Sequence, residues 1–182
     1  MQVTDTEIPE IKLIEPTVYN DHRGFFLESF NQRVFENKLG FEVHFVQDNH
    51  SKSNRGVLRG LHYQLNPHAQ GKLVRVMQGE VFDVAVDIRK SSPHFGQWSG
   101  RVISAENKRQ VWIPPGFAHG FLVLGDTAEL VYKTTDYWVK DLERTIAWDC
   151  PHIGIEWPVH GKPVLSEADA AAPGLLLAEL FL

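Results

Sequence analysis

Residues 55–64, RGVLRGLHYQ, place one histidine among two arginines and two glycines in a segment that alternates like a β-strand. Successive side chains of a strand point to opposite faces. A regular strand therefore puts Arg59 on one face and His62, with Gly60 and Gln64, on the other. His62 on an inward face is either a core histidine bonded to a backbone carbonyl or a group that performs chemistry. The ionisable side chains in neighbouring segments favour the second interpretation.

Three residues in or beside predicted strands could act together on one substrate. An imidazole such as that of His62 is a competent general base near neutral pH. The ammonium group of Lys72 could stabilise an oxyanion as it forms, and the hydroxyl of Tyr132 could return a proton from another direction. These are the roles that proton removal beside a carbonyl group requires. Taken singly, Lys72 could instead be a solvated strand end, and Tyr132 a half-buried strand aromatic.

The run VFDVAVDI, residues 81–88, adds two carboxylates to this picture. Its alternation separates the large apolar side chains from Asp83 and Asp87, which we place on the inner face with Val81 and Ala85. A small β-barrel with several ionisable groups pointing inward has a polar cavity rather than a wholly dry core.

Metal binding is the rival use of the histidines. PPGFAH, residues 114–119, fits the Pro-x-Gly-x-x-His pattern of the second cupin motif. The first cupin motif needs His-x-His and then a glutamate, but Gln64 occupies the second histidine position and no glutamate follows before Glu80. A site of two histidines and one carboxylate is not supported, and we expect no metal. His119 is instead assigned a hydrogen-bonding or structural role.

Two arginines beside glycines, Arg23 and Arg59, suit the recognition of a phosphorylated small ligand. Aromatic side chains could provide a stacking surface for a nucleobase; they are Phe25, Phe26, Tyr137 and Trp138. The alternatives are that the arginines are exposed turn residues and that the rings belong to the core.

The composition limits the class of protein. The 182 residues include 43% hydrophobic and 23% charged residues and carry a formal net charge of −5, so we expect one globular domain over residues 1–182. The acidic balance argues against nucleic-acid or membrane-surface binding. No apolar run approaches the roughly 18 residues of a membrane span, and the first residues lack the pattern of a secretory signal. A single cysteine, Cys150, is consistent with a cytoplasmic location.

Strand signals dominate the chain and are separated by turn residues, which predicts an all-β antiparallel sandwich or barrel. The predicted strands cover residues 81–88, 101–104, 109–113, 119–124 and 128–135, and a strand before the turn at residues 78–80. Helix signals are few. Residues 31–39 precede the stop residue Gly40, residues 166–172 begin with Ser-x-x-Asp, and the C-terminal leucines are a further candidate.

At four places the sequence closely resembles the dTDP-4-dehydrorhamnose 3,5-epimerase family, and the likeness spans nearly the whole chain. The matching runs are DHRGFFLESF, FVQDNHSKSNRGVLRGLHYQ, WIPPGFAHGFLVL and VYKTTDYW. The resemblance implies a cupin-type jelly roll (a double-stranded antiparallel β-helix with a few short helices), usually a homodimer, that uses no metal or other cofactor. It also implies the 3,5-epimerisation of dTDP-4-dehydro-6-deoxy-D-glucose to dTDP-4-dehydro-L-rhamnose. That reaction lies on the route to dTDP-L-rhamnose and to surface polysaccharides such as O-antigen lipopolysaccharide.

The same resemblance assigns roles residue by residue. The catalytic base is His62, its partner carboxylate is Asp169, the general acid is Tyr132, and Lys72 lies near the keto oxygen. Positions associated with substrate binding are Arg23, Phe26, Glu28, Gln47, Asp48, Asn49, Arg59, Lys72, His119, Trp138 and Glu143. In this family the N-terminal strand can cross to the partner subunit, so one active site can use both chains.

Two positions depart from the family pattern. Trp138 stands where members often carry a tyrosine that stacks on thymine, and a tryptophan should preserve the stacking. Ala168 stands where many members have a lysine, and its loss could weaken phosphate contacts or alter substrate preference. The other functions left open are a 3- or 5-monoepimerase, a ketoisomerase of a related nucleotide sugar, and a non-catalytic cupin that only binds a nucleotide sugar. A metal-dependent cupin oxygenase is a further alternative.

Overall fold

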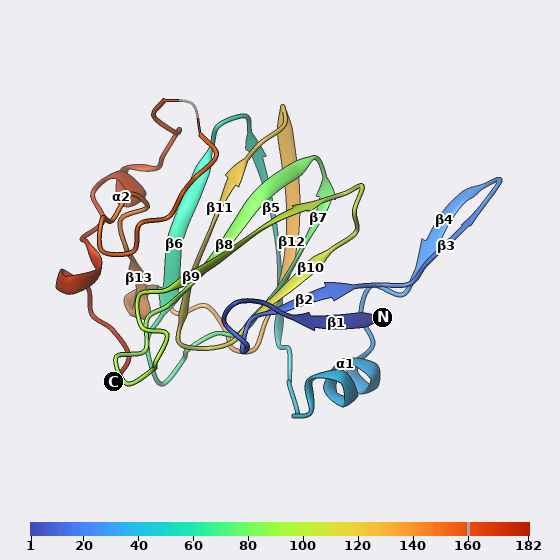
Figure 1. Cartoon of the computed structure of the whole chain (residues 1–182), viewed down its shortest axis with the longest axis horizontal. Coiled ribbons are helices and arrows are strands. Elements are labelled where there is room, and N and C mark those ends of the chain that lie inside the picture. Colours follow the sequence, from blue (N-terminus) through green and yellow to red (C-terminus); the bar gives the residue numbers. More distant parts are fainter. Residues whose placement is uncertain (160) are drawn as a thin grey trace.

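The computed structural model describes residues 1–159 and 161–182 as two antiparallel sheets packed face to face, with a hairpin arm and a C-terminal segment outside them (Figure 1). The first sheet has six strands in the spatial order β1 (Gln2–Asp5), β2 (Lys12–Glu15), β10 (Gln110–Ile113), β7 (Lys72–Gln78), β12 (Thr127–Thr134) and β5 (Gln47–Asn54). The second has five, in the order β13 (Glu143–Thr145), β6 (Leu58–Gln64), β11 (Phe117–Val123), β8 (Glu80–Asp87) and β9 (Trp98–Ser104).

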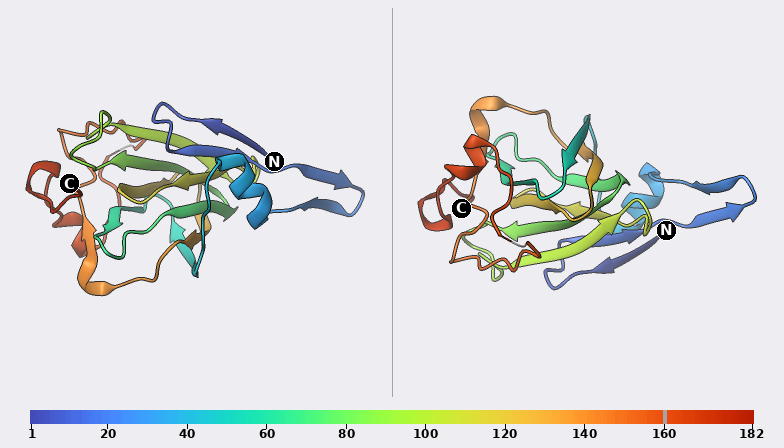
Figure 2. Two further views of the ribbon diagram at one scale, coloured as in Figure 1. Left: turned by 90° about the horizontal axis from the view of Figure 1, so that it is seen from below. Right: turned by 90° about the horizontal axis from the view of Figure 1, so that it is seen from above.

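All strand pairs of both sheets are antiparallel, and the views from below and above show the sheets as two layers (Figure 2). This arrangement confirms the expected all-β, cupin-type jelly roll. Short elements without a long helix are consistent with that class. Among the residues that the structure describes, no helix has the length and apolarity needed to cross a membrane.

The alternation of β8 sets the two faces of its sheet. Val81 and Ala85 belong to the core between the sheets, whereas Val84 and Val86 pack in a second cluster with residues of the C-terminal segment such as Leu175. The inner placement of Asp83 and Asp87 that the sequence predicts follows from this register. Both faces of β8 are therefore covered. For this reason seven of its eight residues are either apolar or buried aspartates.

The turn at residues 78–80 exists, but it does not close a hairpin. Gly79 has φ of +76°, and a Cβ there would lie 1.9 Å from the carbonyl oxygen of Thr127. β7 and β8 belong to different sheets, so at Gly79 the chain crosses from one layer to the other. A residue without a side chain is required at this crossing because another backbone approaches closely.

The predicted helices begin and end near the expected residues. α1 (Gln32–Leu39) has Asn31 as N-cap and Gly40, at φ of +82°, as C-cap. α2 (Glu167–Ala170) is short, and the hydroxyl of its N-cap Ser166 accepts from the Asp169 N–H at 3.1 Å. The C-terminal leucines form only a 3₁₀ turn, η2 (Leu175–Leu177); a second 3₁₀ turn, η1 (Lys140–Leu142), precedes β13.

A two-stranded arm projects from the edge of the sandwich (Figure 1). It consists of β3 (Val18–Asp21) and β4 (Gly24–Leu27), which pair only with each other. Tyr19, Phe25 and Phe26 are each more than half exposed on it. An arm with three exposed rings buries little apolar surface within its own chain.

Candidate active site

His62 and Asp169 form the shortest histidine–carboxylate contact among the described residues. His62 Nε2 lies 2.5 Å from Asp169 Oδ1, although the two residues are 107 positions apart. The His62 side chain is 33% exposed and that of Asp169 only 3% exposed. The imidazole therefore has one nitrogen held by a buried carboxylate while part of the ring remains open to a ligand.

α2 holds the carboxylate in place. Burial alone would raise the pKa of Asp169, but hydrogen bonds from His62, Ser166 and the Gly60 amide outweigh burial and leave the pKa below its ordinary value. Asp169 is thus ionised at neutral pH. An ionised carboxylate orients the imidazole and stabilises the imidazolium that forms when His62 takes a proton.

A β-bulge in β6 corrects the regular alternation expected from the sequence. His62 pairs with His119 and Arg59 pairs with Phe121, so three residue steps on β6 match two on β11. The extra residue returns Arg59 to the inner face that carries His62. A regular strand would place these two side chains on opposite faces, and the bulge brings them to the same face.

Gly60 makes the bulge possible. Its φ is +134°, and a Cβ there would lie 2.5 Å from the Cα of Gly120 and 3.0 Å from the carbonyl oxygen of His119. Two glycines on adjacent strands therefore let β6 and β11 approach at the bulge. Arg59, re-aimed by it, is held where its Nε donates to the hydroxyl of Ser53 at 2.9 Å.

Lys72 begins β7 and points into the space between the sheets. Its Nζ donates to the carbonyl oxygen of His62 at 3.4 Å. Burial lowers the pKa of Lys72 to about 8, while the carboxylates of Glu143 and Asp83 act in the opposite direction. The alternative of a solvated strand end is wrong, because Lys72 is only 9% exposed.

Tyr132 lies on the six-stranded sheet, opposite the sheet that carries His62. It pairs with Val74 and Asn49 in neighbouring strands and packs against the core between the sheets. Burial raises the pKa of Tyr132; Arg59 opposes this effect and Glu143 adds to it. The phenol stays protonated at neutral pH and is able to donate a proton.

His119 forms a second, deeper pair. Its Nε2 lies 2.8 Å from Asp83 Oδ2, and the two side chains are 9% and 1% exposed. The other carboxylate oxygen, Asp83 Oδ1, is buried and has no hydrogen-bond partner within the described part of the chain. Asp87, also inner-facing, is bound instead by Arg89 and Ser92, so it stabilises the loop after β8.

Four predicted binding residues meet at the edge where β5 and β13 begin and β6 ends. Gln47 Nε2 donates to Asn49 Oδ1 at 3.0 Å, and Gln47 Oε1 accepts from the Trp138 N–H at 3.1 Å. The indole Nε1 of Trp138 donates to Glu143 Oε2 at 3.1 Å. These contacts join Gln47, Asn49, Trp138 and Glu143 into one polar and aromatic rim.

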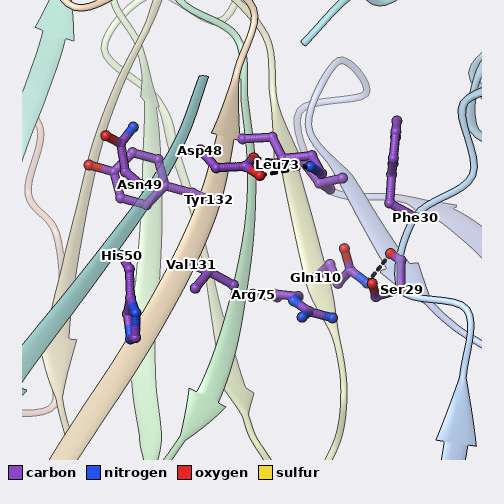
Figure 3. Close-up of a pocket in the computed structure, with 11 residues that line it drawn as sticks. Ser29, Phe30, Asp48, Asn49, His50, Leu73, Arg75, Gln110, Val131 and Tyr132 are labelled. Atoms are coloured by element: carbon purple, nitrogen blue, oxygen red, sulfur yellow. Dashed lines mark hydrogen bonds and ion pairs between the residues drawn. The ribbon is translucent and has the colours of Figure 1, made fainter. Parts of the chain in front are cut away.

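Asp48 does not join this rim. Strand alternation turns it to the outer face of the six-stranded sheet, where Lys133 Nζ donates to Asp48 Oδ1 at 3.0 Å. Figure 3 shows Asn49 beside the Tyr132 ring, whereas Asp48 points toward Leu73. Asp48, Arg75 and residues around them line an outer cavity of about 320 Å³, separate from the pair His62–Asp169.

Arg23, Phe26 and Glu28 also lie apart from His62. Arg23 is at the turn of the arm and forms an ion pair with Asp21 at 2.6 Å. Phe26 is 68% exposed on β4, and Glu28 follows β4, where it accepts a hydrogen bond from Asn31 at 3.2 Å. Within one chain these three predicted binding residues do not reach the site.

An open cavity of about 630 Å³ lies at His62, between β13 and the C-terminal segment, and Glu143 and Asp169 also line it. Ala168 and Lys140 are part of the same wall. Within residues 1–159 and 161–182, no group of three or more His, Cys, Asp or Glu side chains is arranged to hold a metal ion. Of the proposed proton-transfer groups, this cavity is lined by His62 and Asp169, whereas Lys72 and Tyr132 lie deeper, between the sheets.

Gln64 is a further site residue whose role the sequence did not indicate. In the sequence, Gln64 is distinctive only because it replaces the second histidine of the first cupin motif. In the structure its buried amide bonds the loop that carries Trp138. The available signal was the rule that an inward-facing amide must be hydrogen-bonded, but its partners in that loop lie more than 70 residues away.

The fold and these facing groups define an acid–base enzyme built on a cupin-type jelly roll. A family model described as dTDP-4-dehydrorhamnose 3,5-epimerase matches residues 5–176. The epimerase of that name from Shigella flexneri is 62% identical over 182 residues, which is all of both chains. The one from Pseudomonas aeruginosa is 58% identical and covers 100% of this chain and 99% of its own.

Solved structures agree with the sequence comparison. An epimerase from Legionella pneumophila in complex with dTDP-4-keto-L-rhamnose is 55% identical, with a TM-score of 0.94 over 97% of this chain and 93% of its own. A 3′-monoepimerase from Streptomyces bikiniensis, in complex with dTDP-quinovose, is 35% identical, with a TM-score of 0.88 over 94% and 87%. The chain belongs to the dTDP-4-dehydrorhamnose 3,5-epimerase family.

Proposed function

We propose that this chain epimerises dTDP-4-dehydro-6-deoxy-D-glucose at C3 and C5, giving dTDP-4-dehydro-L-rhamnose. One observation carries the proposal: a base with its carboxylate, His62 and Asp169, lies on one sheet, and a proton donor, Tyr132, lies on the inner face of the other. Inversion of a carbon requires removal of a proton from one side and its return from the other. Groups on facing sheets meet that requirement.

The ketone at C4 acidifies the C–H bonds at C3 and C5. His62 Nε2 faces Asp169, so Nδ1 is the nitrogen left to take the proton. The electron pair of the broken C–H bond moves onto the keto oxygen, and the resulting enolate is stabilised by the ammonium of Lys72. Tyr132 then gives its hydroxyl proton to the opposite side of the same carbon, and exchange with solvent restores both side chains.

The nucleotide part of the substrate would lie along the rim. Trp138 offers an exposed ring for the base, and Gln47, Asn49 and Glu143 offer hydrogen bonds. Arg59, fixed by Ser53, is the cation placed for a phosphate. His119 contributes from the floor beside His62.

The active unit in this proposal is a homodimer, with residues 1–182 as a single domain in each subunit. The support is the arm, which carries Arg23 and Phe26 away from its own barrel and leaves its rings exposed. If the arm lies on a second copy, both residues and Glu28 complete the partner's site. A cytoplasmic location is part of the same proposal, and Cys150 is a free thiol in keeping with it.

Heavy water distinguishes the candidate reactions. The protein is incubated with dTDP-4-dehydro-6-deoxy-D-glucose in D₂O, and NMR measures deuterium at C3 and C5 and the configuration of each carbon. Double epimerisation predicts deuterium at both carbons with both inverted. A monoepimerase, the activity stated for the Streptomyces bikiniensis relative, predicts one inverted carbon, and a binding protein predicts no incorporation.

Tyr132→Phe refines this test. The variant keeps His62 and Lys72, so deuterium should still enter the recovered substrate while net inversion falls by about 10²-fold or more. Equal loss of exchange and inversion would contradict the role of Tyr132 as the acid from the opposite face.

The dimer is tested by complementation between two inactive variants. His62→Asn and Arg23→Ala chains are coexpressed, and the heterodimer is isolated through two different tags. If the arm acts in trans, one site of each heterodimer is intact, and a population of heterodimers recovers about half of wild-type activity. A monomer by light scattering, or a heterodimer no more active than its parents, would contradict the proposal.

A further inference from the structure

Gln64 takes no part in proton transfer, yet its side chain is buried and fully bonded. It is 4% exposed. Its Nε2 donates to the carbonyl oxygen of Tyr137 at 2.9 Å and to that of His68, and its Oε1 accepts from the Val139 N–H at 2.7 Å. The bonds to Tyr137 and Val139 reach the two residues that flank Trp138.

The Trp138 ring itself has little support. It is 53% exposed, and its hydrogen bonds are those of the backbone N–H to Gln47 and of the indole N–H to Glu143, each at 3.1 Å. A ring that is not packed into a core is positioned by its backbone. Here three consecutive residues, 137–139, are each bound by a glutamine amide of the barrel.

The strand that carries the base also carries this amide. Gln64 lies two residues after His62 on β6, and it pairs with Glu143 in the β6–β13 register. The positions of His62, Glu143 and the 137–139 loop are therefore set by one short stretch of sheet. A ligand that touches both Trp138 and His62 would meet them at a fixed separation.

We propose that Gln64 is a positioning residue that fixes residues 137–139, and through them Trp138, as the platform for the nucleobase of the substrate. The inference rests on the proposed function, and it assigns Gln64 to nucleotide affinity rather than to proton transfer. A neutral imidazole has one donor and one acceptor, so the histidine of a metal-binding cupin could not make these three bonds. An amide at position 64 is thus suited to a loop clamp.

The test uses Gln64→Leu, which removes all three bonds, and Gln64→Glu, which keeps the length and the acceptor but loses both donors. We expect Gln64→Leu to raise KM and the Kd for dTDP about tenfold while kcat changes less than threefold. Gln64→Glu should give a smaller effect in the same direction, and it serves as the test variant if Gln64→Leu does not fold. Ser104→Ala is the control. It removes a buried side-chain hydrogen bond at the turn of Ser104 and Asn107, away from the 137–139 loop.

A double-mutant cycle with Trp138→Ala separates positioning from general loosening. If Gln64 acts through Trp138, Gln64→Leu in the Trp138→Ala background should weaken dTDP binding less than twofold further. Additive losses, or unchanged KM and Kd in folded Gln64 variants, would overturn the inference. A wild-type protein that neither binds dTDP nor exchanges deuterium would instead overturn the proposed function.

Discussion

Two of the histidine–carboxylate pairs among the described residues, His62–Asp169 and His119–Asp83, lie side by side, and they differ in access. His62 and His119 are direct neighbours across β6 and β11. The carboxylate of His119 comes from the adjacent strand β8, so that pair is built wholly within one sheet and is almost fully buried. The carboxylate of His62 arrives on α2 from the far end of the chain, and the ring stays 33% exposed.

The comparison shows that a pair of histidine and aspartate side chains can have different roles in different surroundings. A buried pair built within one sheet contributes to the structure of that sheet and to the polarity of its inner face. A pair whose carboxylate sits behind the ring, on an added segment, leaves the front of the imidazole for a substrate. Access, and not residue type, distinguishes the proposed base from its neighbour.

Replacing the two histidines in turn is the strongest test of this comparison. His62→Asn should lower kcat by about 10²–10⁴-fold, the usual contribution of a general base. It should lower stability by only about 1 kcal/mol, because Asp169 keeps its hydrogen bonds with Ser166 and the Gly60 amide. His119→Asn should lower stability by about 1–3 kcal/mol, because Asp83 is left buried with a weakened partner, and should lower kcat far less. Activity assays and calorimetry on both variants check this, and near-normal turnover in His62→Asn would refute the assignment.

Lys72 connects the two pairs, because its ammonium group donates a hydrogen bond to the His62 carbonyl oxygen and interacts electrostatically with Asp83. Lys72→Met should lower kcat by about 10²–10³-fold through loss of the oxyanion contact. In the wild type, a pKa of about 8 means that Lys72 loses its proton between pH 7 and 9, well below the ordinary lysine range. Activity should therefore fall as pH rises through 8, and a pH–rate profile flat to pH 10 would contradict the role.

The variant Gly60→Ala tests whether the bulge brings His62 and Arg59 to the same face. A Cβ in Gly60→Ala would lie 2.5 Å from Gly120 Cα, so β6 must shift, at a cost of about 1–3 kcal/mol and about tenfold in kcat/KM. Gly56→Ala is the matched control. Gly56 also has positive φ, +72°, but nothing lies within 4 Å of its Cβ position, so the control isolates backbone strain. Equal effects of the two variants would show that strand separation is not what matters.

The smallest expected effect concerns acid stability. The pKa of Asp169 is lowered in the folded state, so its contribution is fully present above the ordinary carboxyl pKa and is lost as pH falls through the folded value. Asp169→Asn should therefore remove about 1 kcal/mol at pH 7 and flatten the decline of stability below pH 4. Denaturant unfolding at several pH values measures this, and parallel curves for variant and wild type would contradict it.

Local patterns predicted several elements well. Asn31 and Gly40 bound a helix, because a cap and a stop act on the backbone beside them. The alternation of residues 81–88 correctly assigned Asp83 to the interior. By contrast, β5 reads QDNHSKSN, without an apolar side chain, and the sequence alone gives no reason to expect a strand there. It exists because its backbone pairs with β12 along eight residues.

The amino-acid sequence by itself determined the all-β class, the family and the set of groups suited to proton transfer, since residue types and strand periodicity are local properties. Tertiary structure alone decided that Arg59 shares a face with His62, that Asp83 rather than Asp87 meets His119, and that Gln64 holds the loop of Trp138. Each of these depends on register between strands or on contacts across 36 to 75 residues. Such contacts are fixed by the packing of the whole sheet, which no short segment encodes.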